Sequence, residues 1–100
     1  MRLLQIEFKN CVWRGIRLEG RLQNWMEGDP HEFAIGWHYT QSCFDLTEYY
    51  HKESGPTRGK HFFFKSFSDV ELHMSKWASN LPSFREEVNL FIAEMVAEVI

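Results

Sequence analysis

Apolar and polar residues alternate over much of the first two thirds of the chain. The alternation is clear in residues 3–9, 16–23 and 33–40, and a period of two predicts strands with one buried face. A helix is the alternative for residues 16–23, whose leucines also fit helical spacing. Gly15 and Gly20 would each weaken such a helix by about 1 kcal/mol, so a strand is favoured. We expect residues 16–23 and 33–40 to form a hairpin.

Two further segments extend the expected sheet. Residues 43–50 alternate less clearly, and both a strand and a short helix stay open there. The segment 60–67 is strand-like and apolar on both faces around residues 62–64. A strand of that kind is expected in the centre of a sheet or under cover on both sides. The sequence thus predicts an antiparallel sheet of four to five strands within residues 3–66.

The apolar period becomes helical in the last third of the chain. The sequence Ser68-x-x-Glu71 is a capping box that opens a helix over residues 69–80, and Pro82 ends it. A second box, Ser83-x-x-Glu86, opens another helix over residues 84–99. In both segments the apolar side chains fall on one stripe, which predicts that each helix packs against the sheet.

These elements predict an α+β fold of one domain, residues 1–100, with both C-terminal helices packed on one face of the sheet. A chain of 100 residues suits one compact domain. The helices should cover the face that carries these apolar residues: Leu4, Ile6, Phe8, Ile16, Leu18, Leu22, Ile35 and Trp37.

Composition and charge narrow the classes of function. Aromatic residues make up 16% of the chain, which is a high load for a core of this size. The net charge is −3, whereas a general nucleic-acid binder is normally basic, so nucleic acid is not expected as the partner. Residues 1–25 and 51–67 are basic and residues 26–50 and 68–100 are acidic. Such asymmetry suits electrostatically steered association with a charged protein.

The cellular location and the state of the two cysteines can be predicted from short features of the sequence. The N-terminal segment has no apolar run typical of a signal peptide, and no window approaches the roughly 18 apolar residues of a membrane span. We therefore expect a cytoplasmic protein without a membrane partner. Cys11 and Cys43 could form a disulfide, but both lie beside apolar residues, which favours buried free thiols.

Histidines supply the main candidates for catalysis. His51 and His61 flank a Gly-Pro turn and could act as general base and acid, with Lys60 or Arg58 stabilising a phosphoryl transition state. This arrangement would give a small metal-independent ribonuclease or another phosphoryl-transfer enzyme. The alternative is that these polar residues only flank a solvated turn. The histidines have no i,i+4 helical pair and the cysteines no CxxC spacing, so no metal or cofactor is expected.

The face of the sheet away from the helices is the candidate binding surface, because two helices can cover only one side. Arg, Tyr and His interleaved with Phe are typical of protein-binding surfaces, although the alternative is an ordinary solvated face. A second candidate surface is formed by the acidic stretch from Glu27 to Glu48 together with the glutamates of the last helix. The expected partner-binding residues are Arg17, Arg21, His38, Tyr49, His61, Phe63 and Lys65, and Glu19 and Asp45 are expected on the same face.

We interpret the chain as a small non-catalytic binding protein that neutralises or modulates one partner protein by steric and electrostatic occlusion. Bacterial immunity proteins and phage-encoded inhibitors have this general description, and a toxin or a nuclease is the kind of partner expected. Two alternatives stay open. One is the enzyme that uses His51 and His61, and the other is a structural homo-oligomer, such as a homodimer, that buries the open face against a second copy.

Overall fold

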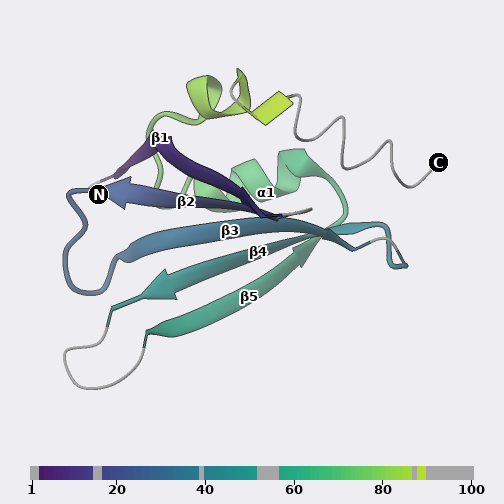
Figure 1. Ribbon diagram of the computed structural model, residues 1–100, viewed down its shortest axis with the longest axis horizontal. Helices are drawn as coiled ribbons and strands as arrows, with labels where there is room; N and C mark the ends of the chain where they lie inside the picture. The colour runs from purple at the N-terminus through teal and green to yellow at the C-terminus, as the bar shows by residue number, and fades with distance from the viewer. Residues whose placement is uncertain (1–2, 15–16, 39, 52–56, 87, 90–100) are drawn as a thin grey trace.

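Each strand of the sheet pairs with its neighbours in the sequence, which gives a five-stranded antiparallel meander (Figure 1). The computed structural model describes residues 3–14, 17–38, 40–51, 57–86 and 88–89. The strands, in sheet order, are β1 (Gln5–Arg14), β2 (Arg17–Gln23), β3 (Pro30–His38), β4 (Cys43–Tyr50) and β5 (Arg58–Phe64).

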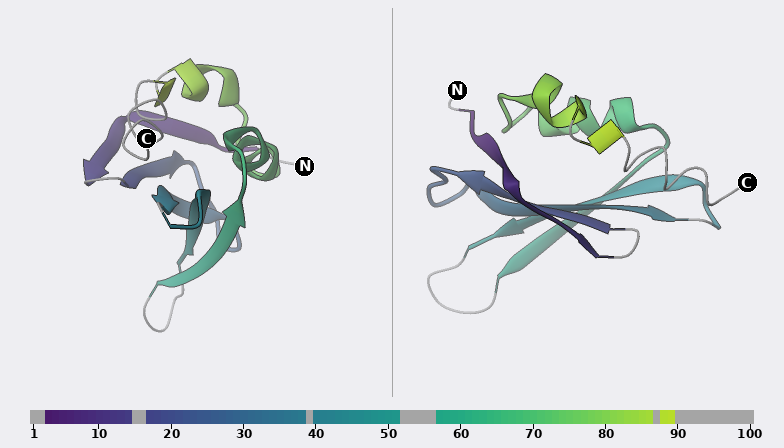
Figure 2. Two further views of the ribbon diagram at one scale, coloured as in Figure 1. Left: turned by 90° about the vertical axis from the view of Figure 1, so that its right-hand side faces the viewer. Right: turned by 45° about the horizontal axis from the view of Figure 1, so that its top comes forward.

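Two helices follow the sheet and lie on the same side of it (Figures 1 and 2). The first is α1 (Phe67–Met74), and the second begins at residue 81 and is described over residues 81–86 and 88–89. The predicted α+β architecture is therefore confirmed. Within the described part of the chain, no helix is both long enough and apolar enough to span a membrane.

The covered face of the sheet carries the apolar residues expected there. Residues 17–23 and 43–50 both form strands, so the helix alternatives for these two segments are wrong. Phe8 and Ile16, also expected on this face, lie outside the residues whose side chains are described. The confirmed core residues are Leu4, Ile6, Leu18, Leu22, Ile35 and Trp37.

The expectation of a central position for the strand with three phenylalanines is wrong. Among the described strands, β5 pairs with β4 alone and lies at the edge of the sheet. Phe62 and Phe64 point to the helix side, where their rings lie 4.3 and 5.4 Å from the ring of His73. Phe63 points to the other face and is 59% exposed. The run is apolar on both faces, but only the helix-side rings, which are partly buried, pack against the helical layer.

The predicted helix caps are displaced from the observed ones. Ser66, rather than Ser68, caps α1, because its hydroxyl accepts from the backbone amide of Asp69 (3.2 Å). α1 then ends at Met74. Pro82 lies in the first turn of the second helix instead of ending the first, which is allowed because an amide in that turn has no helical acceptor. Ser83 is consequently inside this helix and does not cap it.

The segment between the helices is bound to the start of the sheet. The amide of Leu4 donates to the carbonyl of Trp77 (2.7 Å), and the amide of Ser79 donates to the carbonyl of Leu4 (2.9 Å). The side chain of Asn80 bonds to both the amide and the carbonyl of Ile6, at 2.9 and 3.2 Å. Residues 77–80 therefore protect the first part of the β1 edge and hold the second helix over the sheet.

A buried carboxylate joins the helical layer to the middle of the sheet. Glu48 of β4 is only 3% exposed and points to the helix side. It accepts hydrogen bonds from Tyr50 Oη (2.8 Å), His73 Nε2 (3.0 Å) and Trp77 Nε1. These donors come from β4, from α1 and from the segment after α1. The expectation that Glu48 belongs to an acidic surface is wrong, because its charge faces the core.

Tyr50 is held as a donor by the same environment. Burial raises the pKa of Tyr50, and the hydrogen bond to Glu48 together with the charges of Glu48 and Asp29 raises it further. A phenol whose pKa is raised stays protonated above the usual range near 10. Tyr50 therefore continues to donate to Glu48 into alkaline solution.

Replacing Glu48 with alanine should lower the free energy of unfolding by about 3 kcal/mol or more, because buried donors would lose their acceptor. Urea denaturation followed by far-UV circular dichroism measures this loss. The matched control is Glu86→Ala, since Glu86 is exposed and its removal should change stability by no more than about 0.5 kcal/mol. Equal stabilities of the two variants would contradict a structural role for the buried carboxylate.

Candidate functional site

The face of the sheet away from the helices brings together the residues expected there. In an antiparallel sheet, residues that pair across strands share a face. Three neighbouring rows of paired residues define this face, which we call the open face. Crossing from β2 to β5, the rows are Arg17–Gly36–Asp45–Phe63, Glu19–Ala34–Thr47–His61 and Arg21–Glu32–Tyr49–Gly59.

A chain of polar side chains runs across the open face. Asp45 accepts from His38 Nε2 through Oδ2 (3.2 Å) and from the Thr47 hydroxyl through Oδ1 (3.3 Å). Thr47 Oγ1 lies 3.0 Å from Nδ1 of His61, which itself lies 3.8 Å from Asp45 Oδ1. Asp45 is 18% exposed by side chain, and the two imidazoles are 41% and 59% exposed. The carboxylate therefore positions two accessible rings.

Phe63 supplies an accessible aromatic surface beside these rings. Its ring centroid lies 5.5 Å from that of His38, and His61 is two residues away on the same face of β5. At 59% exposure, most of the ring of Phe63 is in contact with solvent. A large apolar side chain among fixed polar groups is typical of an anchor in a protein interface.

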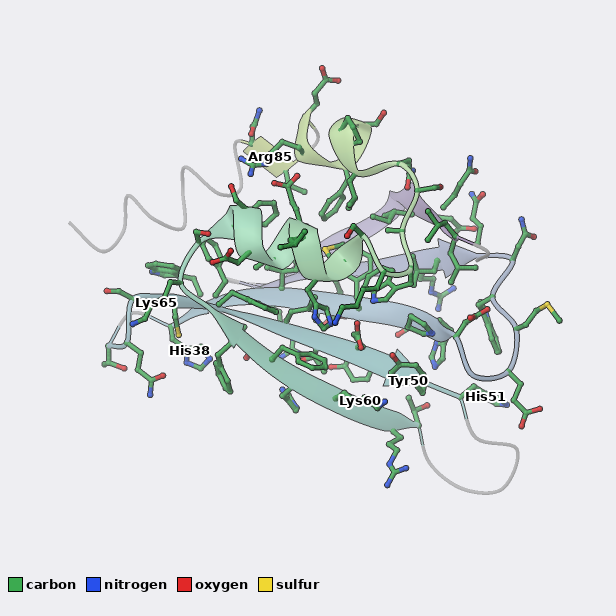
Figure 3. All side chains as sticks on the ribbon, turned by 180° about the vertical axis from the view of Figure 1, so that it is seen from behind. His38, Tyr50, His51, Lys60, Lys65 and Arg85 are labelled. Carbon is green, nitrogen blue, oxygen red and sulfur yellow. The ribbon has the colours of Figure 1, made fainter. Side chains whose placement is uncertain are left out.

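The cationic residues of the open face are partly held in place. Arg17 donates through Nη2 to the hydroxyl of Tyr49 (2.6 Å), and both side chains are half-buried. Arg21 lies 3.4 Å from the carboxylate of Glu32 and is 64% exposed by side chain. Lys65 follows β5, is exposed, and lies at the same end of the sheet as His38 (Figure 3). All seven expected binding residues are therefore on this face or at its border.

The two histidines proposed for catalysis are not brought together. His51 lies at the other end of β4, with its ring 5.6 Å from Trp25 and 6.3 Å from His31 (Figure 3). His61 instead contacts Thr47, four residues earlier in the chain than His51, which is roughly 13 Å along a strand. Lys60 lies over the ring of Tyr50, 4.9 Å from its centroid, on the helix side of the sheet.

An accessible apolar turn was missed by the sequence analysis. Trp25 and Met26, after β2, are 40% and 62% exposed. Hydrogen bonds from the Met26 amide to Asp29 Oδ2 (3.0 Å) and from the Asp29 amide to the Met26 carbonyl (2.9 Å) fix the turn. Gly28 has a φ of +93° there. A cavity of about 320 Å³ adjoins the turn and is lined by Glu7, Arg21, Leu22, Trp25, His31 and Glu32.

The metal-ligating side chains and the thiol of Cys43 were also considered as possible reactive groups. Among the described residues, no three His, Cys, Asp or Glu side chains are placed to hold a metal ion. Cys43 is a buried free thiol, as expected for this residue, and its Sγ lies 3.8 Å from Gln41 Oε1. Neither observation adds a reactive centre to the open face.

Comparisons with protein-family models, with curated proteins and with solved structures gave no match.

Alanine substitution at two neighbouring phenylalanines should distinguish the open face from the core. Phe64→Ala should cost about 2 kcal/mol of unfolding free energy, because Phe64 packs against the core below α1. Phe63→Ala should cost about 0.5 kcal/mol, because its ring is mostly in solvent already. Urea denaturation of both variants measures the difference, and equal losses would show that Phe63 is packed.

Proposed function

We propose that the chain is a non-catalytic binding protein whose open face occludes the functional surface of one partner protein. The observation that carries this proposal is Phe63, an exposed aromatic ring on the open face. It lies beside a hydrogen-bonded set of polar side chains, which are His38, Asp45, Thr47 and His61. An inhibitor of the immunity-protein or phage-encoded kind, acting on a toxin or a nuclease in the cytoplasm, fits this arrangement.

The size of the molecule is sufficient for such an interface. A stable complex of standard size buries about 800 Å² on each partner. The accessible surface of the chain is 6390 Å², so an interface of that size would take up about one eighth of it. Burying the ring of Phe63 would contribute roughly 2 kcal/mol, and the surrounding contacts would supply the remaining affinity.

The hydrogen bonds on the open face favour binding because they reduce its entropic cost. Asp45 fixes His38, Thr47 connects Asp45 with His61, and Tyr49 fixes Arg17. A side chain that is already ordered loses less conformational entropy in a complex, which is worth about 0.5–1.5 kcal/mol each. The polar side chains of the open face are thus preorganised for binding a rigid partner surface.

The two alternatives stay predictions with less support. Phosphoryl transfer by His51 and His61 requires both rings at one phosphate, whereas His51 is packed near Trp25 and His61 is bonded to Thr47. A homodimer would bury the open face against a second copy, and a monomer by light scattering at micromolar concentration would exclude it.

Capture from an extract of the source cells, with the purified chain as bait, tests the proposal. A protein retained by the wild type should bind the Phe63→Ala variant at least tenfold more weakly by isothermal titration calorimetry, because the anchor is lost. The purified wild-type chain should also inhibit the activity of that protein.

The matched control is Leu72→Ala on α1. Leu72 is 71% exposed, so it is as accessible as Phe63 but lies on the helical side of the molecule. Its substitution should leave the affinity unchanged. A partner that is lost with Leu72→Ala and kept with Phe63→Ala, or one that the chain binds without inhibiting, would contradict the proposed function.

A further inference from the structure

The outer edge of β5 is a second feature of the molecule that is suited to binding. β5 is the last strand of the sheet, and beyond it no element of the described chain lies alongside (Figure 1). The backbone amides and carbonyls on its outer side therefore have no strand to pair with, and an extended segment of another chain can satisfy them.

β5 is also regular, as a template for pairing must be. Its seven residue pairs with β4 run without a register shift, and the strand contains no proline. Residues 57–61 are exposed, so the first half of the strand projects beyond the helical layer. The other edge of the sheet is different. β1 has a register shift between Glu7 and Val12, and its start is occupied by residues 77–80.

The charge of β5 and its flank selects the kind of segment that can pair there. Arg58, Lys60 and Lys65 are exposed cations, and residues 57–66 contain no acid. Lysines on an edge strand disfavour pairing with a second copy of the same strand, because like charges accumulate. The same cations attract acidic side chains on an added strand, since opposite charges across a strand pair are stabilising.

We propose that the outer edge of β5 binds an extended acidic segment of the partner protein, which adds a sixth strand to the sheet. This inference rests on the proposed function and names how part of the partner is held. Main-chain hydrogen bonds to β5 supply the pairing, and Arg58, Lys60 and Lys65 select for carboxylates. The added strand lies next to Phe63 and continues the open face toward the partner.

Two synthetic peptides of about eight residues test this pairing. The first alternates glutamate and valine, and the second alternates glutamate and proline. Both have the same charge, but repeated prolines fix φ near −65° and favour polyproline II over an antiparallel strand. In ¹H–¹⁵N spectra of the full chain, the Glu–Val peptide should shift the amides of β5 and protect them from hydrogen exchange. The Glu–Pro peptide should bind at least roughly tenfold more weakly.

Charge variants complete the test. The double variant Arg58→Glu with Lys60→Glu should weaken binding of the Glu–Val peptide roughly tenfold. Lys76→Glu is the matched control, because Lys76 is exposed but lies after α1, and it should have no effect. Equal binding of both peptides, or no shift in β5 with the Glu–Val peptide, would overturn the proposal. Dimerisation of the chain through β5 would show that a second copy, and not an acidic segment, occupies this edge, and would also overturn the proposal.

The outcome is separable from that of the proposed function. A partner that depends on Phe63, together with a Glu–Val peptide that does not bind β5, refutes edge pairing alone. A peptide that binds β5, together with a partner that is indifferent to Phe63, refutes the open-face anchor alone.

Discussion

The arrangement of the molecule depends on one buried carboxylate. Alternation along β4 directs Glu48 to the same face as Phe44 and Leu46, so a charged group enters the apolar layer. A buried carboxylate is tolerated only when donors surround it. His73 and Trp77 come from α1 and from the segment after it, so these elements must lie over that face. The helical layer is thereby fixed to one side of the sheet.

Because the helical layer lies on the Glu48 face, the opposite face of the sheet keeps accessible polar side chains. Both described helices are used on the Glu48 face, and the open face keeps polar residues that bond to one another. Asp45 is the counterpart of Glu48, three strand positions earlier and facing the opposite way. Glu48 orders buried donors that hold the fold together, whereas Asp45 orders accessible rings that a partner can reach. One strand thus carries a structural carboxylate on one face and a positioning carboxylate on the other.

Most of the sheet could be predicted from the sequence because it depends on local alternation. Leu18 and Leu22, with Arg17 and Arg21 on the opposite side, already define both faces of β2. The edge position of β5 could not be predicted in the same way, because three consecutive phenylalanines give no period and the outcome depends on strand order. The cap of α1 was misplaced by two residues, since Ser66 and Ser68 both precede an acid at the right spacing.

The candidate site, too, could be predicted only where it depends on local alternation. The membership of the open face followed from period two, so all its expected residues are found there. The separation of His51 from His61 required the register of β4 with β5, which the sequence does not encode locally. Glu48 was taken for a surface charge because two of its three donors, His73 and Trp77, lie 25 and 29 residues later. Thr47 was missed, although its position between Asp45 and Tyr49 in the alternation marks it as an open-face residue.

The central claim is that the described helices cover one face of the sheet (Figure 1), and that Phe63, His38 and His61 on the other face are accessible to a macromolecule. Relaxation of side-chain protons by a soluble paramagnetic probe, measured on the full chain, tests it most directly. The account predicts strong enhancement for the rings of Phe63, His61 and His38, and weak enhancement for Phe33 and Leu46. Weak enhancement on both faces would show that a second layer shields the sheet and would contradict the account.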